Sequence, residues 1–134
     1  MSEPPGAFEI RIPVEAGDID ELGHVNNVVY VRWVQDAAVA HWQAEAAAGD
    51  QARYVWIVLR HEIDYKQPAM PGDEIVARTW VGSASRLKFE RLTEILRARD
   101  RKVLASARTV WCPIGRETGR PEPVSPEVRE RFSR

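Results

Sequence analysis

A short segment near the start of the chain, DIDELGHVNN at residues 18–27, gathers several side chains that can do chemistry. Asp18, Asp20 and His24 can hold a cation or move a proton, whereas asparagines such as the two that end the segment commonly cap a helix. The segment could therefore be a calcium loop, a helix cap or the chemical centre of an enzyme.

Calcium binding is the first alternative. An EF-hand loop needs oxygen ligands at its first, third and fifth positions, glycine at the sixth and glutamate at the twelfth. Asp18, Asp20 and Gly23 match the first, third and sixth positions. Leu22 and Val29 occupy the fifth and twelfth, where neither can ligate through its side chain. The pattern therefore argues against an EF-hand.

Other catalytic and cofactor signatures are missing. His24, His41 and His61 have no Cys or His companion at a zinc-binding spacing. No GxSxG, GxGxxG or GxxxxGK[ST] sequence occurs. Cys112 lies in a predicted strand without a visible base, so we interpret it as a packing residue. We expect no metal ion and no organic cofactor.

The residue types of the segment alone are equally consistent with a structural loop, in which Gly23 permits a turn and an aspartate accepts loop hydrogen bonds. A helix predicted to begin directly after it favours a functional interpretation. Free N–H groups and a partial positive charge at a helix N-terminus stabilise a developing oxyanion. With a carboxylate a few residues upstream, this arrangement suits acyl transfer or hydrolysis.

The hydrophobic pattern predicts the elements that position the segment. Apolar runs and alternation predict strands at residues 8–15, 54–66, 74–83, 86–98 and 103–114. The fourth could be a helix by composition, but its closely spaced neighbours leave no room for a second crossover. An apolar stripe predicts one helix from Val28 to about Ala48, ended by Gly49 and Asp50. Pro13 lacks an N–H group, which places the first strand at a sheet edge.

These elements predict an α+β fold in which a five-stranded antiparallel sheet wraps around one long central helix. The 134 residues divide into a flexible lead-in at 1–7, one domain at 8–114 and a Pro- and charge-rich tail at 115–134. Within that tail, residues 126–132 are expected to form a short helix.

Composition limits the partners. Lys plus Arg number 19 against 20 Asp plus Glu, whereas nucleic-acid-binding domains usually carry a basic excess. No apolar run approaches the about 20 residues of a membrane span, and the first residues do not form a signal peptide. A lone cysteine suits a reducing compartment. We therefore expect a cytoplasmic protein that binds neither nucleic acid nor membrane.

Three stretches resemble the hot-dog-fold acyl thioesterases: DIDELGHVNNVVYVRW (18–33), HEIDYKQPAMPGDEI (61–75) and SRLKFE (85–90). The sequence is most similar to the 4-hydroxybenzoyl-CoA thioesterase-like branch, and its first stretch also resembles plant acyl-carrier-protein thioesterases. The resemblance implies the hot-dog fold and hydrolysis of acyl-CoA to a free carboxylic acid and CoA. It also implies homodimers or homotetramers with active sites between subunits.

The resemblance assigns catalytic roles by position. Asp20 matches the catalytic carboxylate, which would attack the thioester carbonyl or activate a water molecule. Asn27 matches the position whose backbone N–H polarises the thioester oxygen. His24 matches the histidine of the plant-type HVNN motif, while Asp18 is expected to fix the loop.

Substrate-binding residues are implied in the same way. Tyr30 matches an aromatic position that could line the acyl pocket or simply pack in the core. Arg86 and Lys88 match basic positions that face CoA phosphates in related enzymes, although exposed strand charges explain them equally well. A non-catalytic acyl-thioester-binding or assembly module and an acyl-carrier-protein thioesterase remain the alternatives.

Overall fold

The computed structural model describes residue 4 and residues 6–133, so the lead-in expected over 1–7 falls mostly outside the described residues. The strands are β1 (Phe8–Pro13), β2 (Tyr54–Tyr65), β3 (Glu74–Ala84), β4 (Phe89–Arg97) and β5 (Lys102–Gly115). They form one antiparallel sheet in the order β1-β3-β4-β5-β2. The five predicted strands are confirmed, including the ambiguous fourth, and β1 lies at an edge as Pro13 predicts.

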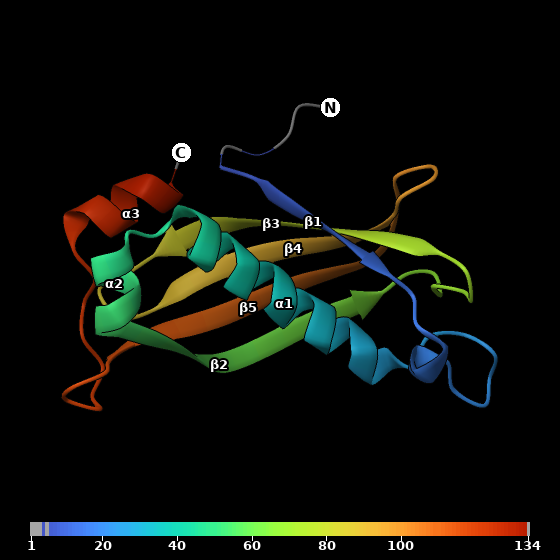
Figure 1. The fold of residues 1–134 in the computed structure, drawn as a ribbon, viewed down its shortest axis with the longest axis horizontal. Coiled ribbons are helices and arrows are strands. Elements are labelled where there is room, and N and C mark those ends of the chain that lie inside the picture. Colours follow the sequence, from blue (N-terminus) through green and yellow to red (C-terminus); the bar gives the residue numbers. More distant parts are fainter. Residues whose placement is uncertain (1–3, 5, 134) are drawn as a thin grey trace.

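The long helix α1 (Asn27–Glu45) lies across one face of this sheet (Figure 1). The predicted apolar stripe faces the sheet and buries Tyr30, Trp33, Val34, Ala37, Ala38 and His41. The opposite face of α1 is open in the single chain, where Val28 is 73% and Val39 47% exposed. The α+β hot-dog architecture is confirmed, with the sheet covering one side of its helix.

The predicted end of this helix is wrong. α1 stops at Glu45, and Gly49 and Asp50 lie inside a second short helix, α2 (Ala48–Arg53). The side-chain amide of Gln51 donates hydrogen bonds to the carbonyls of Gln43 (3.2 Å) and Ala46 (2.9 Å). These bonds satisfy acceptors that a helix end otherwise leaves open. The alanine-rich sequence carries no sign of this break.

The C-terminal segment docks on the body of the protein. The predicted helix at 126–132 is confirmed as α3 (Pro126–Phe132), and the Ser125 side chain caps it by accepting the N–H of Val128. The ring of Phe132 stacks on Trp42 of α1, with centroids 5.5 Å apart. Figure 1 shows α2 and α3 together at the C-terminal end of α1.

Two clusters of buried side chains follow the two halves of α1. The first surrounds its N-terminal half and includes Val25, Tyr30, Trp33, Ile75, Ile95 and Leu104. The second surrounds its C-terminal half and includes Ala38, Tyr54, Phe89, Trp111, Val128 and Phe132. The first cluster therefore supports the segment at residues 18–27, and the second is completed by α3.

Candidate active site

Asp18 holds the loop in front of α1. It ends a short 3-10 helix, η1 (Ala16–Asp18), and is only 4% exposed. Its carboxylate accepts the N–H of Glu15 (2.9 Å) and a guanidinium N–H of Arg32 (2.9 Å). Burial alone would raise the pKa of Asp18, but these two donors outweigh it and hold the pKa below its usual value. The expected role of Asp18 in fixing the loop is confirmed.

Asp20 sits in a tight turn of the same loop. Its N–H donates to the carbonyl of His24 (3.0 Å), and its own carbonyl accepts the N–H of Gly23 (3.0 Å). Gly23 has a φ of 84°, which an L-residue adopts only with strain. One carboxylate oxygen accepts the N–H of Leu22 (2.9 Å). The other accepts no hydrogen bond from any described residue.

The helix N-terminus lies just beyond this turn. Asn26 is the N-cap, and its side chain accepts the N–H of Val28 at 2.9 Å. The carbonyl of Asn26 accepts the N–H of Val29 at 3.0 Å. The N–H of Asn27, the first helical residue, donates to none of the described residues. Asn27 therefore offers a backbone donor at the positive end of the helix.

His24 and Asn27 border a pocket of about 210 Å³ beside this N-terminus, together with Tyr65 and residues 66–68. The Nδ1 atom of His24 is buried and has no hydrogen-bond partner among the described residues. The lining residues do not include Asp20. The structure thus brings His24 and Asn27 to one pocket, and Asp20 to the adjacent turn.

Tyr30 is a core residue that also borders the pocket. Its ring packs against Trp33 (5.1 Å between centroids) and Tyr65 (5.2 Å). Its hydroxyl oxygen accepts the N–H of Ala69 at 2.8 Å, and burial raises its pKa. Both expected roles, packing and pocket lining, are compatible with this position.

Arg86 and Lys88 lie in the turn between β3 and β4, far from Asp20 within one chain. The guanidinium of Arg129 in α3 donates to the carbonyls of Ser85 (2.7 Å) and Arg86 (3.1 Å). This turn is thus at the C-terminal end of α1 (Figure 1). A helix of 19 residues spans about 28 Å. One chain therefore does not bring the predicted phosphate-binding residues to the predicted catalytic loop.

Sequence reasoning missed the support that the segment after β2 gives to this site. The hydroxyl of Tyr65 donates to the carbonyl of Asn27 (3.1 Å), and the N–H of Val25 donates to the carbonyl of Ala69 (2.9 Å). These contacts join positions about 40 residues apart, so no local pattern reveals them. The only signal is that Tyr65 belongs to the second resembling stretch.

It also missed Arg91, a buried cation at the other end of α1. Arg91 is 8% exposed and its guanidinium donates to Nδ1 of His41 at 2.9 Å. His41 is the core histidine that its place on the apolar stripe predicts. The available signal for Arg91 was its place in the alternating pattern of β4. It lies two residues from both Phe89 and Thr93, so all three side chains point to the same, buried face of the strand.

A comparison with protein families matches residues 14–132 to the thioesterase-like superfamily. No curated protein matches the chain. Among solved structures, a thioesterase from Thermus thermophilus, complexed with coenzyme A and zinc, is 27% identical with a TM-score of 0.79. That alignment covers 94% of this chain and 97% of the other.

Two further structures share the fold at lower identity. A 1,4-dihydroxy-2-naphthoyl-CoA thioesterase from Synechocystis is 20% identical, covers 94% of this chain and 95% of its own, and has a TM-score of 0.80. An acyl-ACP thioesterase from Bacteroides thetaiotaomicron is 21% identical with a TM-score of 0.84. It matches 100% of this chain but only 56% of its own length.

Two structural findings bear on the expected partners. No three His, Cys, Asp or Glu side chains group together in the described part of the chain in a way that could hold a metal ion. The described helices also include none that is long and apolar enough to cross a membrane.

Proposed function

The chain belongs to the thioesterase-like superfamily and its class of activity is thioester hydrolysis, and we propose that it cleaves acyl-CoA at the N-terminus of α1. One observation carries this proposal. Asp20 keeps a carboxylate oxygen without an internal partner in the turn directly before a helix whose first N–H, that of Asn27, also lacks one among the described residues. A nucleophile or base and an oxyanion donor are thus offered close together along the chain.

The proposed reaction uses these two groups in either of two ways. In one, the Asp20 carboxylate attacks the thioester carbonyl, the C–S bond breaks, and water then hydrolyses the resulting anhydride. In the other, Asp20 takes a proton from a water molecule that attacks the carbonyl directly. In both, the N–H of Asn27 and the helix dipole stabilise the oxyanion, and CoA leaves as a thiol.

His24 is proposed as the third member of this site. Its Nδ1 atom is buried without a partner among the described residues, and the residue itself borders the pocket that Asn27 also borders. A polar atom in this position can bind a substrate oxygen or a water molecule, because leaving it without a hydrogen bond is unfavourable. We assign His24 to orienting the group that Asp20 activates or attacks.

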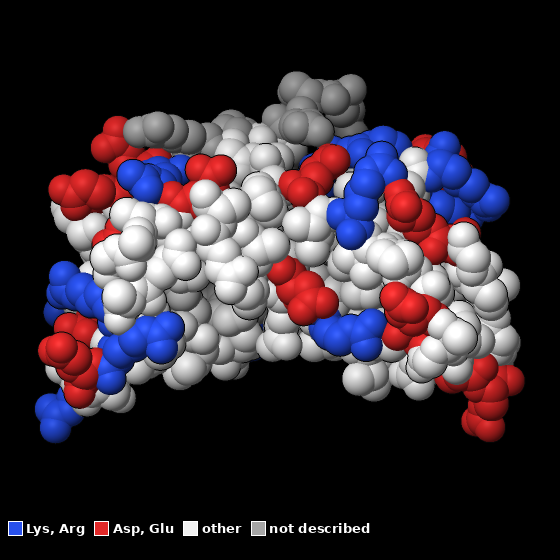
Figure 2. Space-filling model, in the orientation of Figure 1, with Lys and Arg blue, Asp and Glu red and all other residues white. Residues whose placement is uncertain are grey.

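A homodimer through β2 is the proposed assembly. β2 is an edge strand, and large apolar residues are exposed on it and on the open face of α1, namely Val28, Val39, Ile57 and Leu59. Figure 2 shows this face, where uncharged residues cover much of the middle and lower edge and charged residues of both signs lie mainly toward its two ends. Exposed apolar area of this kind commonly marks an interface.

Such a dimer would complete the site. Two β2 strands that pair antiparallel about a two-fold axis bring the C-terminal end of one α1 next to the N-terminal end of the other. Arg86 and Lys88 of one subunit would then approach Asp20 of the other, where they can pair with CoA phosphates. A tetramer would add contacts between two such dimers.

The test is hydrolysis of a panel of aliphatic and aromatic acyl-CoAs, followed by a dye that traps the released thiol. Asp20→Asn should lower kcat by about 10²- to 10⁴-fold, whereas Asp36→Asn, on the exposed face of α1, should not change it once gel filtration shows that this control keeps the oligomeric state of the parent. Unchanged turnover in Asp20→Asn overturns the assignment. Binding without thiol release across the panel would identify a non-catalytic module, and activity restricted to carrier-protein thioesters would identify the other alternative.

A further inference from the structure

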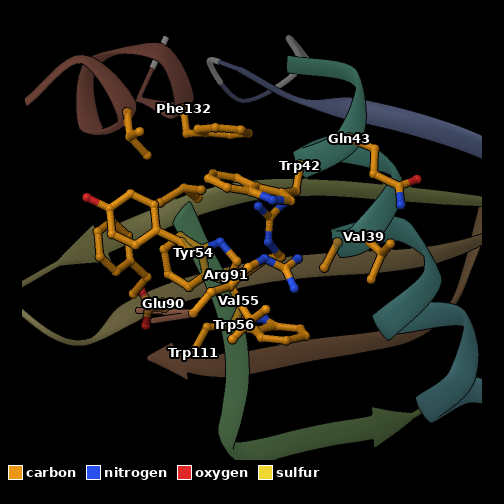
Figure 3. Close-up of a pocket in the computed structure, with 15 residues that line it drawn as sticks. Val39, Trp42, Gln43, Tyr54, Val55, Trp56, Glu90, Arg91, Trp111 and Phe132 are labelled. Atoms are coloured by element: carbon orange, nitrogen blue, oxygen red, sulfur yellow. The ribbon is translucent and has the colours of Figure 1, made fainter. Parts of the chain in front are cut away.

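A second cavity, of about 300 Å³, lies beside the C-terminal half of α1. Figure 3 shows its lining side chains, which come mainly from α1, from the four strands β2 to β5 and from α3. The apolar lining residues that matter here are Val39, Trp42, Trp56, Phe89, Trp111 and Phe132. A concave site of this size with mostly aromatic walls matches the usual properties of a small-molecule pocket.

A buried cation reaches into the middle of these aromatic side chains (Figure 3). The guanidinium of Arg91 donates to Nδ1 of His41 at 2.9 Å and to the hydroxyl of Thr79 at 3.1 Å. The described residues place no carboxylate within ion-pair distance of it. Glu90 also borders the cavity, but its carboxylate is held by the N–H of Ser83 and the guanidinium of Arg108.

The contacts of Arg91 leave its charge uncompensated. Burial lowers the pKa of Arg91 to about 10, so the guanidinium remains protonated at neutral pH. Burial and the neighbouring charge of Arg91 lower the pKa of His41 to about 4, so its imidazole is neutral and acts as an acceptor. A buried charge without a counter-ion is costly, and an anionic ligand would remove that cost.

Two further polar groups of the wall are donors without acceptors among the described residues. The indole Nε1 atoms of Trp56 and Trp111 are buried and have no hydrogen-bond partner among the described residues. The hydroxyl of Tyr54, another lining residue, donates to the carbonyl of Pro123 at 3.4 Å. The cavity therefore combines the buried charge of Arg91, the exposed Arg116 at its border, two unused indole donors and apolar walls.

We propose that this cavity is a binding site for a free organic carboxylate with a flat or slender apolar body, whose carboxylate pairs with Arg91. A carboxylate brings one negative charge and two acceptor oxygens to a single guanidinium. The aromatic walls bury its body. The site lies at the other end of α1 from Asp20 in the same chain, and its existence does not depend on the proposed hydrolysis.

The test is isothermal titration calorimetry of the full chain with benzoate, 2-naphthoate and octanoate, each compared with its neutral amide. We expect each acid that binds to do so at least tenfold more tightly than its amide. The Asp20→Asn and Asp36→Asn variants should bind as the unmodified chain does. Equal affinity for acid and amide, or no binding of any acid, overturns the proposal.

Two variants test the location. Arg91→Met should lower the affinity for the acids at least tenfold and remove the preference over the amides. Val39→Trp fills the mouth of the cavity from an exposed position on α1, leaves Arg91 in place, and should weaken both acid and amide. Because Val39 also lies on the proposed dimer surface, the comparison uses a variant with the thermal stability and the oligomeric state of the parent, and unchanged acid binding in that variant overturns the proposal.

The Asp20 variant separates the two proposals. Loss of hydrolysis with unchanged carboxylate binding supports both. Loss of carboxylate binding in Asp20→Asn would place the ligand at the helix N-terminus and overturn the second site. Carboxylate binding in a chain that hydrolyses no acyl-CoA would support the second site and overturn the proposed function alone.

Discussion

The polar groups at the two ends of α1 differ in how far the chain itself satisfies them. At the N-terminal end, Asp18 has two donors and Asn26 caps the helix, which leaves one oxygen of Asp20 and the N–H of Asn27 available. At the C-terminal end, Arg91 is buried with no anion beside it among the described residues. The first end has open polar groups where we propose the reaction, whereas the second has a buried cation for which we propose a ligand.

The largest expected effect on stability belongs to the C-terminal end. Phe132→Ala removes a buried ring that stacks on Trp42 and contacts His41, and it should lower the free energy of unfolding by about 3–4 kcal/mol. Urea denaturation measures this loss, and Phe132→Leu is the control with a smaller effect. A loss below about 1 kcal/mol would mean that α3 is not part of the folded core.

A fall in pH should have the next largest effect on stability, again through the C-terminal end of α1. The pKa of His41 is about 4 in the folded chain, below its ordinary value of 6.5, so the unfolded chain binds a proton that the folded chain does not. Stability is therefore full above pH 6.5 and declines as the pH falls toward 4, by at most about 3 kcal/mol. His41→Gln keeps an acceptor for Arg91 and should flatten this part of the urea-unfolding profile.

At the N-terminal end of α1, substitutions of the two aspartates should differ in their cost to stability, because Asp18 holds the loop and Asp20 is the proposed catalytic residue. Asp18→Asn weakens the ion pair between the buried Asp18 carboxylate and the half-exposed Arg32, and it should cost about 1–2 kcal/mol of stability. Asp20→Asn keeps an oxygen that can accept the N–H of Leu22 and should cost less than about 0.5 kcal/mol. Thermal unfolding of both variants checks the contrast. Equal destabilisation would make Asp20 a second scaffold residue.

A smaller effect than that of Asp18→Asn is expected at the contact between Tyr30 and the segment after β2. Tyr30→Phe removes the oxygen that accepts the N–H of Ala69 but keeps the ring. It should cost about 1 kcal/mol because a buried donor loses its partner. Hydrogen exchange at the Ala69 amide should increase, while that at Ile95 in the sheet should change only with overall stability.

Much of this arrangement follows from local sequence pattern. Alternation locates every strand, and the three- and four-residue stripe identifies the buried side of α1 down to His41. The type and spacing of Asp18, Gly23 and the asparagines identify a capped helix start. These features are readable because each depends on residues a few positions apart.

The features that sequence did not reveal depend on distant residues. Gln51 ends α1 by reaching back to Gln43 and Ala46, although a helix could continue through the alanines by propensity alone. The charge of Arg91 is buried because α1 and α3 cover it. Its position in the alternating pattern of β4 indicates only which face of the sheet it lies on. The separation of Arg86 from Asp20 follows from sheet topology, which decides at which end of α1 each turn lies.

The two edges of the sheet differ in a way that limits growth of the assembly. β1 is only six residues long and ends in Pro13. Two of its side chains form ion pairs, Glu9 with Arg101 and Arg11 with Glu74. β2 offers twelve residues with exposed Ile57 and Leu59. Charges, proline and short length discourage strand addition at an edge. In the proposed dimer, pairing through β2 would use up the more receptive edge of each chain, so that sheet-to-sheet association would close at two copies and would not propagate into a fibre.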